Sequence, residues 1–322
     1  AAYSAVNQGH CHPRLVKALT EQAQRLSLCS RAFRNDQLGR LCQEISALTG
    51  YDRFLPMNSG AEAVETAVKL ARKWGQTVKG VPAAKGEILV FDNNFHGRTT
   101  TIVGFSSSEQ YRDGFGPFAG GYRLLPFGDA DAVAAAMNER TVAVLVEPIQ
   151  GEAGIVLPPQ GYLARLRELT TKHNALLLVD EIQSGLGRTG ALFAFQHEGI
   201  RPDLVTVGKA LSGGFYPVSG ILADSALMNV FKPGDHGSTF GGNPLGAAVA
   251  REALKVLVEE RMIENSAKLG AYALERLRAI RSPHILEVRG RGLWIGIELK
   301  PEAGGARRFC EQLAIEGILC KE

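Results

Sequence analysis

The chain has 322 residues, of which 45% are hydrophobic and 21% charged, and this composition is typical of a globular protein with a sizeable core. Its 36 basic and 33 acidic residues leave a formal net charge of +3, which argues against a dense basic face for nucleic acid and favours a small-molecule partner. No apolar run approaches the roughly 20 residues of a membrane span, so we expect no membrane contact.

The five cysteines are odd in number, scattered, and never spaced as C-x-x-C. This usage argues against a disulfide framework and indicates a reducing compartment: the cytoplasm for a bacterial chain, the mitochondrial matrix for a eukaryotic one. The motif "GHCHP" brings His10, Cys11 and His12 together, but it lacks a second ligand cluster, and we predict no metal site. No signal peptide is visible, although the abrupt opening "AAYSAVNQGH" leaves a processed or missing leader open.

The first strong helix signal lies at residues 57–75, "MNSGAEAVETAVKLARKWG". Ser59 is placed as the N-cap, and Glu62, three positions later, completes a capping box. Small residues at a helix N-terminus expose backbone N–H groups and the positive end of the helix dipole, which suits a phosphate. Most capping boxes merely start helices, so this signal alone leaves the phosphate site open.

Farther along, short apolar runs alternate with helical patterns, as in a mainly parallel sheet with helices on both faces. Strands are expected at 87–91, 143–147, 175–181 and 203–209, and a helix at 161–173. The pattern becomes a long helix at 241–260, and beyond it a helix at 262–280 and a strand at 292–299 indicate a smaller α+β unit. We therefore predict an α/β fold with an N-terminal segment (1–9), a large domain (10–245) and a small domain (246–322).

Three ionisable side chains follow apolar runs: Glu147, Asp180 and Lys209 each lie at the carboxyl end of an expected strand. Because ligands of open α/β sheets bind outside that edge, we expect the three groups to converge on one cleft. A lysine there either leaves the core for water or is kept neutral and reactive, since burial lowers the pKa of lysine and its amine can then form a Schiff base. Its position alone leaves both possibilities open.

Six motifs carry a resemblance to a known family: "MNSGAEAVETA", "NFHGRT", "VEPIQGEAG", "DEIQSGLGRTG", "GKALSGG" and "HGSTFGGNP". In their order and spacing the chain resembles the class III aminotransferases of PLP fold type I over nearly its whole length. The resemblance implies pyridoxal 5'-phosphate as cofactor, a mainly parallel sheet sandwiched by helices with a smaller α+β domain, and a homodimer with shared active sites.

Four further segments resemble the family members that act on ornithine more than those that act on acetylornithine or 4-aminobutyrate: "YSAVNQGHCHP", "GFGPF", "GGFYPVSGIL" and "KPGDHGSTFGGNPLG". This implies transfer of the δ-amino group of ornithine to 2-oxoglutarate, giving glutamate and glutamate 5-semialdehyde, which cyclises to pyrroline-5-carboxylate. Another ω-aminotransferase, acting on acetylornithine or 4-aminobutyrate, and a cofactor-binding protein without catalysis are the alternatives.

The resemblance also assigns contacts to the cofactor ring. It implies that Lys209 carries the cofactor covalently and shuttles a proton, and that Asp180 keeps the pyridine nitrogen protonated. Phe95 is expected to stack on the ring and Gln183 to hydrogen-bond its phenolic oxygen. His96 is expected to be only a neighbour of Phe95.

Contacts to the cofactor phosphate are implied for two pairs of residues. Gly60 and Ala61 are expected to bind it through backbone N–H groups. Ser238 and Thr239 are expected to reach the phosphate of the neighbouring subunit, which would make the dimer the active unit.

Substrate contacts are implied for Arg98, Glu152 and Tyr3. Arg98 matches the arginine that binds substrate carboxylates bidentately. Glu152 matches a glutamate that pairs with a C-terminal arginine while ornithine is bound and releases it for glutamate. Tyr3 aligns with a tyrosine that helps to select ornithine, and Glu147 is expected to have a supporting role. The family extends beyond both ends of this chain and includes that arginine and a further tyrosine. Either the chain is a fragment or the dual-substrate switch is lost, and we expect a fragment because every interior motif is intact.

Overall fold

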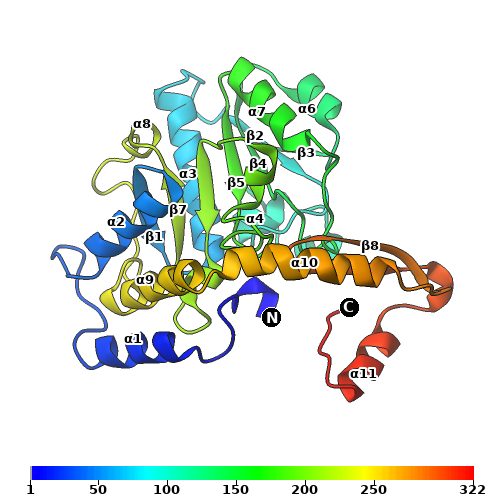
Figure 1. Ribbon diagram of the computed structural model, residues 1–322. Coiled ribbons are helices and arrows are strands. Elements are labelled where there is room, and N and C mark those ends of the chain that lie inside the picture. Colours follow the sequence, from blue (N-terminus) through cyan, green and yellow to red (C-terminus); the bar gives the residue numbers. More distant parts are fainter. Residues whose placement is uncertain (1) are drawn as a thin grey trace.

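The computed structural model describes residues 2–322 and has a central seven-stranded sheet in the order β1-β7-β6-β5-β4-β2-β3 (Figure 1). Its strands are β1 (Arg53–Met57), β2 (Glu87–Phe91), β3 (Tyr122–Leu125), β4 (Thr141–Val146), β5 (Leu176–Asp180), β6 (Leu204–Val207) and β7 (Ser219–Ala223). β7 runs antiparallel to β1 and β6, and the remaining neighbours are parallel. The expected mainly parallel α/β fold is confirmed.

Two apolar layers form because successive residues of each strand point to opposite faces of the sheet. Val144 and Val146 of β4 pack on the face covered by α2 (Leu38–Thr49), α7 (Tyr162–Lys172) and α9 (Pro244–Glu259). Ala143 and Leu145 of the same strand pack on the opposite face, against α3 (Gly60–Thr77). A strand that is buried on both faces has a continuous run of apolar residues. For this reason the positions of β2, β4, β5 and β6 could be predicted from the sequence.

The chain beyond α9 forms a smaller unit. There α10 (Met262–Arg278) lies along an antiparallel pair made of β8 (Ile285–Arg291) and β9 (Trp294–Leu299), and α11 (Arg307–Ile315) stands apart from the central sheet (Figure 1). The apolar side of α9 itself joins the core of the large sheet. The division at 245/246 stays a prediction.

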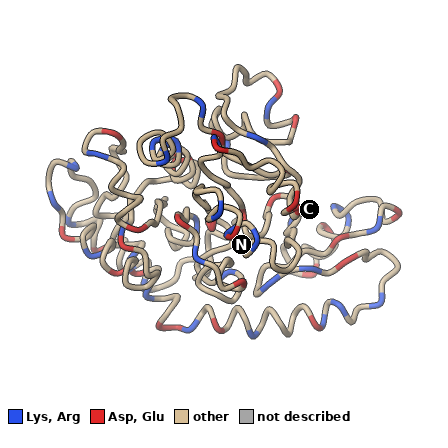
Figure 2. The backbone as a smooth tube through the Cα atoms, turned by 90° about the horizontal axis from the view of Figure 1, so that it is seen from above, with Lys and Arg blue, Asp and Glu red and all other residues tan. Residues whose placement is uncertain are grey.

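Short elements complete the fold. They are α1 (Pro13–Ala23), α4 (Thr100–Gly104), α5 (Glu109–Arg112), α6 (Ala130–Ala136), α8 (Ser225–Met228) and the 3-10 turns η1 (Ala2–Ser4), η2 (Ala194–Glu198), η3 (Lys209–Ser212) and η4 (Pro301–Ala303). Basic and acidic residues are interspersed along the chain (Figure 2). Within residues 2–322, none of the helices combines the length and the apolar character needed to cross a lipid bilayer. The compartment stays a prediction.

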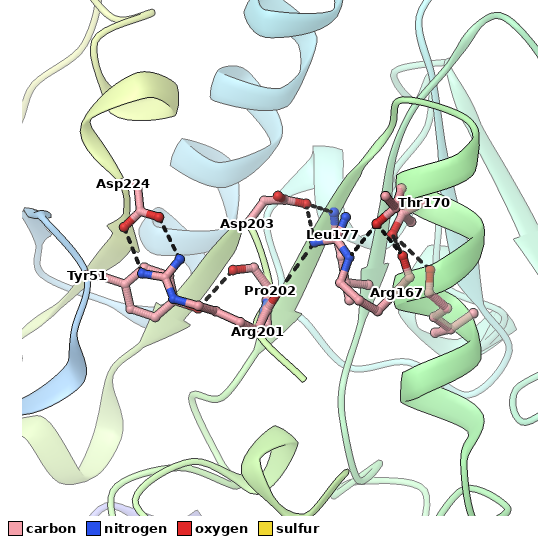
Figure 3. A network of polar contacts seen from close by, with 10 residues as sticks. Tyr51, Arg167, Thr170, Leu177, Arg201, Pro202, Asp203 and Asp224 are labelled. Atoms are coloured by element: carbon pink, nitrogen blue, oxygen red, sulfur yellow. Dashed lines mark hydrogen bonds and ion pairs between the residues drawn. The ribbon is translucent and has the colours of Figure 1, made fainter. Parts of the chain in front are cut away.

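A polar network closes the sheet at the amino ends of its parallel strands (Figure 3). Oδ2 of Asp203, just before β6, accepts hydrogen bonds from the Arg167 guanidinium at 2.8 Å and from the Leu177 N–H at 2.7 Å. Arg201 makes two bonds, of 2.5 and 2.8 Å, to Asp224, which follows the antiparallel β7. These contacts link neighbouring segments at this edge of the sheet. The cavity described below lies at the opposite edge, at the carboxyl ends of the parallel strands.

Candidate active site

One cavity lies at the carboxyl ends of the parallel strands. Glu147 follows β4, Asp180 ends β5 and Lys209 follows β6, and all three side chains line this cavity. These strands are neighbours in the sheet, so their ends meet at one edge. The other lining residues are Gly60, Ala61, Phe95, His96, Gly97, Ile149, Ile182 and Gln183. The convergence expected from the three strand ends is observed.

Lys209 begins η3 with a backbone φ of 42°, in the left-handed region that residues other than glycine rarely adopt. Such strain is found where the surrounding structure fixes a residue for function. Burial lowers the pKa of its ammonium group, and the charges of Asp180, Glu152 and Glu147 offset this only in part. The amine is therefore more readily neutral than that of an exposed lysine, which suits a nucleophile or a proton carrier.

Asp180 and His96 form a buried pair at the cavity wall. Nδ1 of His96 lies 2.6 Å from Oδ2 of Asp180, and the side chains are 1% and 4% exposed. Oδ1 of Asp180 accepts hydrogen bonds from the Ile182 N–H at 3.1 Å and the Thr206 hydroxyl at 2.8 Å. Burial alone would raise the pKa of Asp180, but His96 and these donors hold it below its usual value. Burial likewise opposes the charge of His96, yet Asp180 raises the pKa of the imidazole.

His96 is a site residue that the sequence motifs did not single out. It was expected to be only a neighbour of Phe95, but the loop after β2 directs its ring to the end of β5, 84 residues away in the chain. β2 and β5 both flank β4, which brings the two segments together. The one signal available in sequence was its place in a loop that follows a predicted strand.

Glu147 supports the loop that carries Phe95. Its Oε1 accepts a hydrogen bond from the Phe95 N–H at 2.7 Å, and its Oε2 accepts one from the Gly151 N–H at 3.3 Å. Burial raises the pKa of Glu147 to about 7. These contacts agree with the supporting role expected from sequence, because they fix backbone on either side of the cavity.

The N-terminus of α3 presents an anion cradle. The capping box forms as predicted: the Glu62 N–H donates to Oγ of Ser59 at 3.3 Å, and the Ser59 N–H donates to Oε2 of Glu62 at 2.7 Å. Gly60 and Ala61 line the cavity, and helix geometry leaves their N–H groups without an intrahelical acceptor. A Cβ on Gly60 would lie 3.0 Å from Cδ1 of Ile182. Glycine at this position therefore avoids a tight contact with Ile182 in the cavity wall.

Glu152 bridges two partners beside the cavity. Its Oε1 accepts a hydrogen bond from Nε2 of Gln183 at 3.1 Å, and its Oε2 pairs with Nζ of Lys321 at 2.8 Å. The same Nζ lies 4.6 Å from the centre of the Tyr3 ring. Burial raises the pKa of Glu152, but Lys321 and Gln183 outweigh it and leave the pKa lowered. The cation beside Glu152 in this structure is a lysine, which no motif had indicated.

The remaining predicted residues lie outside the cavity. Arg98 is exposed, and its Cζ lies 4.1 Å from the centre of the Tyr111 ring. Oγ of Ser238 accepts a hydrogen bond from Nδ2 of Asn58 at 2.9 Å, and Thr239 is exposed. The cavity itself gathers six of the residues predicted to bind the cofactor: Gly60, Ala61, Phe95, Asp180, Gln183 and Lys209. Their individual roles stay predictions.

These groups fit pyridoxal phosphate. The cavity offers helix N–H donors for a phosphate, an ionised carboxylate for a protonated pyridine nitrogen and a lysine amine for an aldehyde. Phe95 supplies a flat apolar side chain for the ring. The fold and the site together define a pyridoxal-phosphate enzyme of fold type I.

The chain matches the family Aminotransferase class-III over residues 1–322 and belongs to it. It is 59% identical to the ornithine aminotransferase of Bordetella pertussis, over all of this chain and 78% of that protein. It is 52% identical to the ornithine aminotransferase of Brevibacillus brevis, over all of this chain and 80% of that protein.

Solved structures agree. The ornithine aminotransferase from Toxoplasma gondii ME49 has a TM-score of 0.98 at 44% identity, covering 99% of this chain and 77% of that chain. The acetylornithine aminotransferase from Elizabethkingia anophelis has a TM-score of 0.90 at 50% identity, covering 99% of this chain and 80% of that chain. The expectation of a pyridoxal-phosphate-dependent class III aminotransferase is confirmed.

Proposed function

We propose that this aminotransferase moves the δ-amino group of ornithine to 2-oxoglutarate, giving glutamate 5-semialdehyde and glutamate. The observation that carries the proposal is the Glu152 carboxylate, which pairs with the cation of Lys321 beside Tyr3. While that pair is closed, Glu152 and Lys321 neutralise each other's charge. When it opens, the cation is available to the second carboxylate of a dicarboxylic partner. The relatives from Bordetella pertussis and Brevibacillus brevis, both named ornithine aminotransferase, support this choice of substrate.

Bound pyridoxal phosphate supplies an aldehyde that condenses with amines and a ring that accepts electrons. Asp180, kept ionised by His96, would hold a proton on the ring nitrogen, and the N–H groups at the start of α3 would hold the phosphate. The Nζ of Lys209, whose pKa is lowered by burial, can take a proton from the substrate carbon and return it elsewhere. Arg98 would bind the carboxylate that both substrates carry.

A second candidate donor is N-acetylornithine. The Elizabethkingia enzyme, an acetylornithine aminotransferase, is 50% identical to this chain, slightly more than the Toxoplasma ornithine enzyme at 44%. The two donors share the δ-amino group and the carboxylate and differ in whether the α-nitrogen is charged or acetylated. Selection between them therefore falls on the side chains near that nitrogen, among which we place Tyr3 and Glu152.

An assay of amino donors tests the proposal. With the cofactor-loaded protein and 2-oxoglutarate, we expect kcat/KM for ornithine to exceed that for N-acetylornithine and for 4-aminobutyrate by about 100-fold, because the acetyl group or the absent amine leaves polar groups of the site unpaired. Pyrroline-5-carboxylate and glutamate are the products to be quantified. Faster turnover of N-acetylornithine than of ornithine would overturn the ornithine assignment and leave the family assignment intact.

We infer that the active unit is a homodimer. Ser238 and Thr239 lie outside the cavity of their own chain, as expected of residues that serve a neighbour's phosphate. The phenylalanines Phe33, Phe115 and Phe240 are 72%, 60% and 47% exposed, and aromatic residues are enriched at subunit interfaces.

Sedimentation or light scattering checks the dimer. We expect twice the chain mass of 34.6 kDa at micromolar concentration. We also expect Ser238→Ala and Thr239→Ala to weaken cofactor binding although neither residue lines its own cavity. A monomer that keeps full activity would contradict the shared site.

A further inference from the structure

Arg98 is held by aromatic rings. Within residues 2–322, its guanidinium group makes no ion pair and no hydrogen bond; instead its Cζ lies 4.1 Å from the centre of the Tyr111 ring and 5.7 Å from that of Phe95. The face of an aromatic ring attracts the guanidinium cation without occupying the N–H groups of the guanidinium. A carboxylate neighbour would occupy those N–H groups. The arrangement fixes the guanidinium and leaves its in-plane donors free for a ligand carboxylate.

Tyr111 also touches the residue that faces the cofactor ring. Tyr111 and Phe95 meet edge to face, with ring centres 6.0 Å apart and planes at 78°, a favourable aromatic geometry. Phe95 lines the cavity, and Tyr111 stands behind it on α5. One side chain therefore contacts both the expected carboxylate binder and the expected ring-stacking residue.

Tyr111 also lies near Lys321, the cation that pairs with Glu152. The pKa of Lys321 is raised first by its hydrogen bond to Glu152 and further by the nearby Tyr3 and Tyr111. Tyr111 is half-buried on a helix of four residues, so its removal leaves the two main cores untouched. Neither the capping of α5 nor the apolar core explains an aromatic residue at this position.

We propose that Tyr111 is a positioning residue for substrate carboxylates, which sets the plane of the Arg98 guanidinium through its ring face. The proposal deepens the proposed function and rests on it, because Arg98 is taken as the carboxylate binder. Recognition needs the ring and not the hydroxyl, so phenylalanine should serve and an aliphatic residue should not. The ligand class is any donor or acceptor with a carboxylate at the far end from the reacting carbon.

The first test compares Tyr111→Leu and Tyr111→Met with Tyr111→Phe, using ornithine and its decarboxylated counterpart, 1,4-diaminobutane. In single-turnover half-reactions followed by cofactor absorbance, we expect the aliphatic variants to weaken ornithine binding about 3- to 30-fold, the range of a cation–π contact. We expect Tyr111→Phe to match the native protein and the diamine to react equally in all variants. Equal losses with both donors would mean a merely structural role and would overturn the proposal.

A binding measurement gives a readout independent of turnover. Titration of the cofactor-loaded protein with glutarate, a dicarboxylate that cannot react, should show the same 3- to 30-fold weakening in the aliphatic variants by calorimetry. Phe118→Leu is the matched control, because Arg112 lies 5.3 Å from that ring on the same loop and Arg98 is not involved. Unchanged glutarate affinity in Tyr111→Leu and Tyr111→Met would reject the proposal.

The two hypotheses fail separately. If the native protein prefers N-acetylornithine, the proposed donor is wrong, and the Tyr111 comparison is made with that donor and N-acetyl-1,4-diaminobutane. If no donor reacts, the glutarate titration still decides on Tyr111.

Discussion

Lys209→Ala is expected to lower transamination by at least about 10³-fold, because it removes the amine that we propose both anchors the cofactor and moves the proton. The amine is partly buried, its pKa is lowered, and its backbone is held in a strained conformation at the cavity. Borohydride reduction followed by mass spectrometry should locate a cofactor adduct on Lys209 in the native protein and none in the variant. Stopped-flow half-reactions measure the loss of rate.

The matched control is Lys17→Ala, since this lysine has a side chain 74% exposed and pairs with Glu21 four residues on. It should keep native activity and cofactor content. Small primary amines added to Lys209→Ala should restore part of the rate, because they can carry the proton from solution. A Lys209→Ala protein that turns over at the native rate, or a native protein that stays colourless with the cofactor, would refute the assignment.

Asp180→Asn is expected to lower kcat/KM by about 10²- to 10³-fold, the usual effect of removing one preorganised electrostatic contact. Asparagine has nearly the same shape but cannot neutralise a protonated ring nitrogen, and it leaves the buried His96 without its ionic partner. Cofactor affinity should fall as well. Activity and an absorbance titration with pyridoxal phosphate measure the two effects.

His96→Gln tests the ionisation of Asp180 while leaving its carboxyl group in place. Since His96 lowers the pKa of Asp180, its removal should raise that pKa. The ionised carboxylate is the active form, so activity of the variant should disappear at a higher pH than in the native enzyme as the pH falls. Thr206→Val removes the 2.8 Å hydrogen bond to the same carboxylate. It should shift the acid side of the pH–activity profile in the same direction, but by less. If the acid side of the pH–activity profile is the same in His96→Gln as in the native enzyme, His96 does not control the ionisation of Asp180.

Local sequence determined much of the scaffold. The capping box at Ser59 and Glu62 placed the start of α3, because both partners lie within one helical turn. The run at 87–91 coincides with β2, because a strand buried on both faces must be continuously apolar. Strand-end placement likewise predicted that Glu147, Asp180 and Lys209 would meet, since parallel strands present their carboxyl ends to one edge.

Other elements were not predicted. β1 and β7 pair antiparallel at one side of the sheet, and β7 begins with a serine and a glycine, so neither showed a clear apolar run. β8 was missed because most of its residues are exposed or half-buried, so it lacks a continuous apolar run. Such strands are stabilised by their partners more than by their own side chains.

Several side-chain contacts around the site were decided by tertiary structure alone. His96 reaches Asp180 across 84 positions, and Lys321 reaches Glu152 across 169. Tyr111 lies near Arg98 in sequence, but only the turn of the loop between them stacks the ring on the guanidinium. Periodicity and capping report on neighbours within a few residues, whereas these pairs depend on strand order and loop path. The sequence therefore determined the family and predicted that Lys209 and Asp180 meet in one cavity, and the fold decided which side chains lie against them.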